Sequence, residues 1–193
     1  MRTFKKMPFF IEVGACDFDT CEQLIENGWR GIVIEPVKYY FNKLPKYSHI
    51  HYENLAISDQ DGETKIHYID PERITNESNM WLKGISTLEG KTGPMSIEGN
   101  KELDHFKKCL QQNVRTTTLN KLCEKYEIQD IDFLKIDTEG HDLIVLKSLN
   151  LEKVNVRFIK IEHKHLDRKE IISYLEQYNY LIYVENDDIY AIN

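Results

Sequence analysis

The stretch GWRGIVIEP, from Gly28 to Pro36, decides how the rest of the chain is interpreted. Three consecutive aliphatic residues, 32–34, are followed at once by an acid and a proline. This pattern is typical of a buried strand that ends abruptly. A carboxylate there is costly unless something hydrogen-bonds it, so Glu35 is expected to have a partner at the end of this strand.

The composition places the chain among globular proteins. Its 193 residues are enough for one domain with a core of its own, and 41% are hydrophobic and 30% charged. The net charge of -7 argues against an electrostatic nucleic-acid binder. The four cysteines form no CxxC pair, so neither a zinc site nor a redox motif is indicated. The early apolar run ends at Glu12, too short for a membrane span or signal peptide, so we expect a cytoplasmic protein.

Short apolar runs alternate with helical patterns along most of the chain, which favours a parallel α/β sheet. Thr20 and Gln23 have the spacing of a capping box, so a helix is predicted to start at Thr20, with Gly28 just past its end. The strands predicted at 180–185 and 189–192 flank a turn and indicate an antiparallel hairpin. We therefore expect an α/β fold with a Rossmann-like doubly wound sheet, mostly parallel, that ends in a C-terminal antiparallel hairpin.

Residues 70–112 interrupt this pattern. The segment contains Pro71, Pro94 and two large apolar residues, Met80 and Trp81, in an otherwise polar stretch. A long irregular segment inside a domain is usually functional or disordered. We expect 1–193 to be a single domain in which this insertion covers the substrate site.

The stretch IEVGACDFDT carries the first candidate site. In a doubly wound sheet, ligands bind beyond the carboxyl ends of the strands. Gly14 and Ala15 would let a ligand approach the backbone, and Glu12 could bind an ammonium group directly or through water. The alternative is a tight turn that happens to contain glycine. The stretch is not GxGxxG, which disfavours a nicotinamide or flavin site.

Glu35 is the second candidate. It lies 23 positions after Glu12, at the end of the next predicted strand, where doubly wound folds carry the acid that accepts from ribose hydroxyls. A carboxylate can accept from both hydroxyls. The alternative is a solvated acid at a strand end. Because Pro36 constrains the turn there, we favour a ribose contact.

Two further clusters end later strands. In DFLKIDTEGHD, Asp137 and Glu139 face the same crevice and could orient a hydroxyl, accept its proton or hold a metal, whereas Asp142 is expected to cap a helix. In IKIEHKH, strand alternation allows only one of Glu162 and His163 to enter the site, and His163 could act as a general base. His165 is expected at the surface.

With these residues in view, the sequence closely resembles the FkbM-type methyltransferase family. The matching pieces are IEVGACD, GWRGIVIEP, NLAISDQDGE, TLNKL and IDFLKIDTEGHDLIVLKSL, which together span most of the chain. The resemblance implies a seven-stranded sheet that binds S-adenosylmethionine and transfers a methyl group, usually to a hydroxyl of a sugar or secondary metabolite.

By position, the resemblance implies that the cofactor loop contains Glu12, Gly14, Ala15 and Asp17, and that Glu35 binds the ribose. It places Asn54, Ala56 and Ser58 near the adenine. Asp137 and Glu139 would face the methyl group and the acceptor. The acceptor is expected to be a small molecule or saccharide, such as a glycolipid precursor.

The expected activity is S-adenosylmethionine-dependent O-methylation, with Asp137 as the leading base or substrate anchor and His163 as the alternative. A divalent cation held by Asp137 with Glu139 or Glu162 is a further alternative that the sequence does not favour. Two other functions stay open: a nicotinamide-dependent oxidoreductase and a nucleoside-binding module without turnover. The sequence carries no signal for an oligomeric state.

Overall fold

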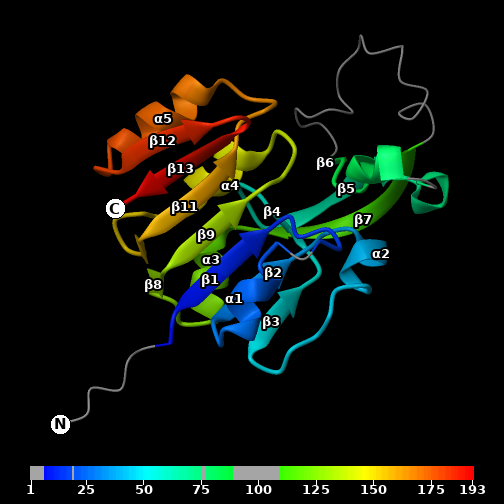
Figure 1. Cartoon of the computed structure of the whole chain (residues 1–193), viewed down its shortest axis with the longest axis horizontal. Helices are drawn as coiled ribbons and strands as arrows, with labels where there is room; N and C mark the ends of the chain where they lie inside the picture. The colour runs from blue at the N-terminus through cyan, green and yellow to red at the C-terminus, as the bar shows by residue number, and fades with distance from the viewer. Residues whose placement is uncertain (1–6, 19, 75–76, 89–108) are drawn as a thin grey trace.

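Seven strands form the main sheet of the computed structural model, which describes residues 7–18, 20–74, 77–88 and 109–193 (Figure 1). In spatial order they are β12 (Leu181–Glu185), β13 (Asp188–Ile192), β11 (Phe158–Glu162), β9 (Phe133–Ile136), β1 (Phe9–Val13), β2 (Arg30–Ile34) and β3 (Ile50–Glu53). The strands from β11 to β3 pair in parallel, and β13 is antiparallel to both of its neighbours. The predicted mostly parallel α/β sheet is therefore confirmed, and its antiparallel pair lies where the hairpin was expected.

Helices cover both faces of this sheet because its strands are apolar on both sides. One apolar cluster joins Ile11, Ile32 and Leu134 to α3 (Leu119–Lys125), α4 (Asp142–Lys147) and α5 (Arg168–Glu176). A second cluster, on the opposite face, joins Phe10 and Val33 to α1 (Glu22–Glu26). The short α2 (Lys38–Phe41) follows β2.

The predicted capping box is wrong. Helix α1 begins at Glu22, and its N-cap residue, Cys21, makes no side-chain cap hydrogen bond. The buried Cys21 and Ile25 pack into the second cluster, so tertiary packing rather than capping holds this five-residue helix. Gly28 has a φ of +81°, which agrees with its predicted left-handed position past the helix.

A second sheet extends from the main one, on the side toward which the β1 arrow points (Figure 1). Its strands, in spatial order, are β4 (Ala56–Ile57), β7 (Cys109–Thr117), β5 (Gly62–Ile69) and β6 (Ser86–Leu88). The 3₁₀ helices η1 (Pro71–Arg73) and η2 (Glu77–Lys83) connect β5 to β6. A minor pair, β8 (Asp130–Ile131) and β10 (Asn155–Val156), completes the strands of the described residues.

Residues 70–112 are thus less irregular than the sequence indicates. β6 and the first four residues of β7 fall inside this range, and β7 pairs with β5 as far as Ile69 and Cys109. The strand CLQQNVRTT buries only Val114, so it lacks the hydrophobic alternation by which a strand is recognised. Residues 89–108 lie outside the described part of the chain.

Candidate functional site

The order of the strands reverses beside β1, which lies between β2 and β9. The chain runs outward from β1 to β3 and then returns to continue on the other side with β9 and β11. The loops that follow β1 and β9 lead to α1 and α4, which pack on opposite faces of the sheet, and this leaves room for a ligand beyond the strand ends. This is where the sequence placed its candidate residues.

Gly14 lets these two loops meet. It has a φ of +83°, and a Cβ built on it would lie 1.8 Å from the backbone oxygen of Asp137. The backbone N–H groups of Gly14 and Ala15 both donate to the carbonyl oxygen of Ile34, at 3.1 Å. The loop after β1 is therefore held against the ends of both neighbouring strands, and only glycine fits at its start.

A cavity of about 270 Å³ opens between these loops and the second sheet. Predicted site residues contribute Gly14, Glu35, Ala56, Asp137 and Glu139 to its lining. η2, β6 and the residues between them contribute the opposite wall, which includes Trp81, Lys83, Gly84, Ile85, Ser86 and Leu88. The cavity thus combines apolar walls with a few carboxylates, as ligand sites usually do.

Glu35 is buried at the edge of this cavity and already has partners. One carboxylate oxygen accepts from the N–H of Cys16 and the other from that of Val37, each at 2.7 Å. Burial raises the pKa of Glu35 to about 7, against the lowering effect of the two backbone donors. Each oxygen keeps a second lone pair, so the carboxylate can both shape the loop at 14–18 and accept from a ligand hydroxyl.

Several predicted cofactor residues have other partners in this structure. The Glu12 carboxylate does not line the cavity; it lies 3.2 Å from the buried Nζ of Lys135. Asp17 pairs with Lys83 at 3.3 Å and so ties the loop after β1 to η2. These contacts stabilise the walls of the cavity. Glu12 and Asp17 therefore lie behind the cavity lining and are not part of it.

Three more predicted residues also lie behind the lining. Ala15 is buried in the cluster under α1. The Asn54 side chain donates to the backbone oxygens of Glu35 and Pro36, at 2.8 and 3.0 Å. Ser58 is buried beside His141, with its Oγ 3.1 Å from Nε2 of that ring. Among the residues predicted near the adenine, Ala56 alone lines the cavity.

Three carboxylates, Asp137, Glu139 and Glu162, enter the cavity from the ends of β9 and β11. Glu139 has a φ of +55°, a left-handed conformation that non-glycine residues rarely adopt, and its Oε2 lies 3.1 Å from Nε2 of His165. His163 does not line the cavity; its Nε2 is buried and has no hydrogen-bond partner among the described residues.

Burial dominates the titration of this acidic group. Desolvation, with the charge of Asp137, raises the pKa of Glu139 to about 7 and that of Glu162 to about 8. Desolvation also lowers the pKa of His165, and the charge of Lys164 lowers it further. At neutral pH the site therefore contains carboxyls that can accept or release a proton.

The residues of the site that sequence reasoning missed or misplaced include Tyr40, His141, Lys164 and His165. The prediction that His165 is at the surface is wrong, because the chain turns after β11 and returns the ring to Glu139. His141, two positions after Glu139, could have been noticed from the sequence. Tyr40 could not, because its pattern is that of an ordinary core residue.

Polar atoms without partners test whether the cavity fits a polar cofactor. Among the described residues, buried Tyr40 Oη and Thr138 Oγ1 have no hydrogen-bond partner, and both residues line the cavity. Buried polar atoms are normally satisfied, so they indicate a ligand with hydroxyl or amine groups. With Gly14 beside them, these atoms fit a nucleoside-type ligand.

Comparison with known proteins agrees with this geometry. The model of the methyltransferase FkbM domain matches residues 12–182. The chain belongs to the FkbM methyltransferase family. The match extends from the end of β1 to β12 and so includes every residue of the cavity lining. The resemblance read from the sequence is thereby confirmed.

Membership of the FkbM family implies a methyl donor and a small-molecule acceptor. No curated protein and no solved structure matches the chain. Within the described ranges, no helix combines the length and the apolar character needed to cross a membrane.

Proposed function

We propose that this FkbM-family domain transfers a methyl group from S-adenosylmethionine to a hydroxyl of a saccharide or another small molecule. The observation that carries the proposal is the cavity at the reversal of strand order, with Glu35 at one side and Asp137 and Glu139 at another. Two chemically different regions thus share one cavity. One suits a nucleoside, and the other suits an acceptor hydroxyl.

The nucleoside region is formed by the end of β2 and the loop after β1. Glu35 accepts from ribose hydroxyls there, and its bonds to Cys16 and Val37 keep it oriented before the ligand arrives. The backbone of Gly14 allows close approach, and Tyr40 Oη supplies a buried hydrogen-bonding group. Bound S-adenosylmethionine would supply the electrophilic methyl group.

The acceptor region is formed by the carboxylates after β9. Asp137, whose side chain is 38% exposed, is the most accessible of them and orients the acceptor hydroxyl or takes its proton. Glu139, two positions further along the chain, also lines this region and helps to hold the acceptor. Alignment of the two reactants supplies much of the rate enhancement, because oriented groups react with effective molarities of roughly 10⁵ M or more.

Calorimetric titration with S-adenosylmethionine, S-adenosylhomocysteine and NAD tests the cofactor assignment. We expect the first two to bind and NAD not to bind. Incubation with hydroxylated acceptors, starting with sugars and glycolipid precursors, should then produce S-adenosylhomocysteine. Binding without product in a broad acceptor screen would instead favour a module that holds the nucleoside without turnover.

Glu35→Ala tests the ribose contact. Loss of the charge-assisted hydrogen bonding to the ribose, about 1.5–3 kcal/mol in total, should weaken S-adenosylmethionine binding roughly ten- to a hundredfold. The variant also leaves the N–H groups of Cys16 and Val37 unpaired, so stability must be controlled. Ile171→Val in α5 is the control, since it removes a buried methylene outside the cavity lining. Normal affinity in folded Glu35→Ala would remove Glu35 from the ribose site.

A further inference from the structure

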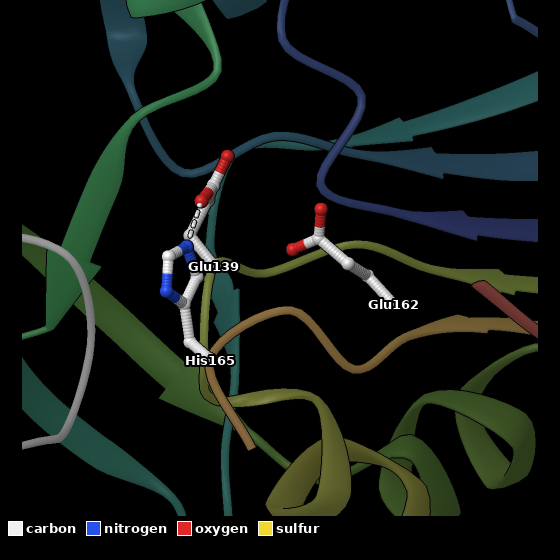
Figure 2. A group of neighbouring side chains, drawn as sticks. All are labelled: Glu139, Glu162 and His165. Carbon is white, nitrogen blue, oxygen red and sulfur yellow. Dashed lines mark hydrogen bonds and ion pairs between the residues drawn. The ribbon is translucent and has the colours of Figure 1, made fainter. Parts of the chain in front are cut away.

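Glu139, Glu162 and His165 converge on one point at the acceptor side of the cavity (Figure 2). Glu139 follows β9, Glu162 is the last residue of β11, and His165 lies three positions beyond it. Each side chain offers one ligand atom, and these atoms all lie within 4.8 Å of one another. Bonds of about 2.0–2.3 Å to a central ion would hold the ligand atoms within this distance of one another.

The group brings several acidic side chains close together. Figure 2 shows the Glu139 carboxylate against the His165 ring, with the Glu162 carboxylate facing the same space from β11. Asp137 adds a third carboxylate to this part of the lining. The side chains of His165 and Glu139 are only 18% and 11% exposed, so water screens the group poorly.

A separate observation concerns Glu162 itself. Its Oε2 is buried and accepts no hydrogen bond from the described residues. A buried carboxylate oxygen without a donor is costly, and proteins resolve that cost with a hydrogen bond, a counter-charge or a metal ion. The convergent geometry and the unpartnered oxygen therefore both indicate a cation as the ligand of these side chains.

We propose that Glu139, Glu162 and His165 bind a divalent metal ion, and that Mn²⁺ matches the site best. Carboxylates suit Mg²⁺, Ca²⁺ and Mn²⁺, whereas imidazole suits Zn²⁺, Fe²⁺ and similar ions, so a set of two carboxylates and one imidazole favours an ion that accepts both. Mg²⁺ prefers oxygen ligands and retains several waters. The sequence had suggested Asp137 as a ligand; the geometry replaces it with His165.

Three protein ligands leave coordination positions open. Resting on the proposed function, we assign one of them to the acceptor hydroxyl, whose pKa the metal lowers. Its proton passes to the adjacent Asp137 carboxylate; the oxygen then forms a bond to the methyl carbon as the bond from that carbon to sulfur breaks. Metal binding itself requires only the three side chains, so it is testable without a methyl donor or acceptor.

The experiment is Mn²⁺ titration of the EDTA-treated, desalted protein, with free Mn²⁺ measured by electron paramagnetic resonance. We expect one bound ion per chain. His165→Ala and Glu162→Gln should each weaken binding by about tenfold or more, because even indirect partners of metal ligands contribute that much. His51→Ala and Glu152→Gln are matched controls at exposed positions and should bind as the wild type does.

Circular dichroism establishes that each variant is folded, and Glu162→Gln keeps the size of the side chain. Absence of Mn²⁺ binding by the wild type at millimolar concentration, or binding reduced less than threefold in both site variants, overturns the metal site. Calorimetry with S-adenosylmethionine on the same metal-free protein separates the two proposals. Mn²⁺ binding without S-adenosylmethionine binding would reject the proposed function and keep the metal site. S-adenosylmethionine binding without Mn²⁺ binding would reject the metal site and keep the proposed function.

Discussion

Gly14 and Gly28 share one backbone conformation, but glycine is required at the two positions for different reasons. Their φ angles are +83° and +81°, a region that side chains rarely adopt. A Cβ on Gly28 would meet no atom within 4 Å, whereas one on Gly14 would overlap the backbone oxygen of Asp137. Gly28 is needed for its conformation alone, and Gly14 is needed also for the contact between β1 and β9.

The two alanine variants should therefore differ. Gly28→Ala should lower the free energy of unfolding by about 1–2 kcal/mol, the cost of a left-handed L-residue. Gly14→Ala should lower it by clearly more, because the backbone at Asp137 must also move. Urea denaturation followed by circular dichroism measures both values. Equal losses would show that the loop accommodates the methyl group and that close approach is unimportant.

Asp137→Asn separates a chemical from a structural role. Asparagine keeps the size and one acceptor oxygen but takes up no proton, so S-adenosylmethionine binding should persist while turnover falls about 10²–10⁴-fold. The measurements are calorimetric affinity and S-adenosylhomocysteine production. Near-normal turnover with a small loss of stability would leave Asp137 a structural residue, paired with Lys135 at 3.4 Å.

At the scale of elements, a buried ion pair joins the two central strands. Glu12 of β1 and Lys135 of β9 are partners in the parallel register, and both are nearly inaccessible. Burial alone would lower the pKa of Lys135, but the Glu12 and Asp137 carboxylates raise it well above its usual value. Lys135 is therefore charged and contributes a fixed positive charge behind the cavity.

A double-mutant cycle tests this pair. Lys135→Met should destabilise the protein by about 3–5 kcal/mol, because it leaves Glu12 buried without its counter-charge. Combining it with Glu12→Gln should restore a large part of that loss, since a neutral amide is cheaper to bury than a carboxylate. Urea denaturation of the wild type and three variants gives the coupling. Additive losses would show that the two side chains act independently.

At the scale of the whole molecule, the main sheet and the second sheet enclose a set of carboxyls with raised pKa values. These are about 7 for Glu35 and Glu139 and about 8 for Glu162, with burial as the main cause. A group whose folded pKa is raised binds more protons in the folded state, so its stabilising contribution is lost as pH rises through that pKa. The pKa of His165 is lowered, so the unfolded state binds more protons than the folded state below about pH 6.5. His165 therefore makes stability fall as the pH falls, but only below that pH.

The stability of the metal-free protein should therefore decrease between pH 6.5 and 8.5. Urea midpoints measured in EDTA across this range test the expectation. Glu162→Gln should make the dependence shallower, because it removes the group that titrates highest, and the exposed Glu152→Gln should leave it unchanged. A midpoint that stays constant or rises across the range would contradict the burial of these charges.

The sequence by itself determined the central architecture and the position of the crevice. Aliphatic runs such as 32–34 are satisfied in a sheet covered on both faces, and acids that follow such runs lie near its carboxyl edge. Glu35, Asp137 and Glu139 were found in this way. The second sheet was only partly predicted, because β7 is largely polar and its pairing depends on β5.

The tertiary structure alone decided which of the candidate side chains share the cavity. Glu12 and Glu35 have the same sequence signal, an acid at the end of an apolar run, yet Lys135 pairs with the first while the second lines the cavity. For a similar reason, His163 was predicted to enter the site and His165 to lie at the surface, whereas His165 contacts Glu139 and His163 does not line the cavity. The turn after β11 sets the direction of each ring, and that turn depends on contacts with β13 that no local pattern encodes.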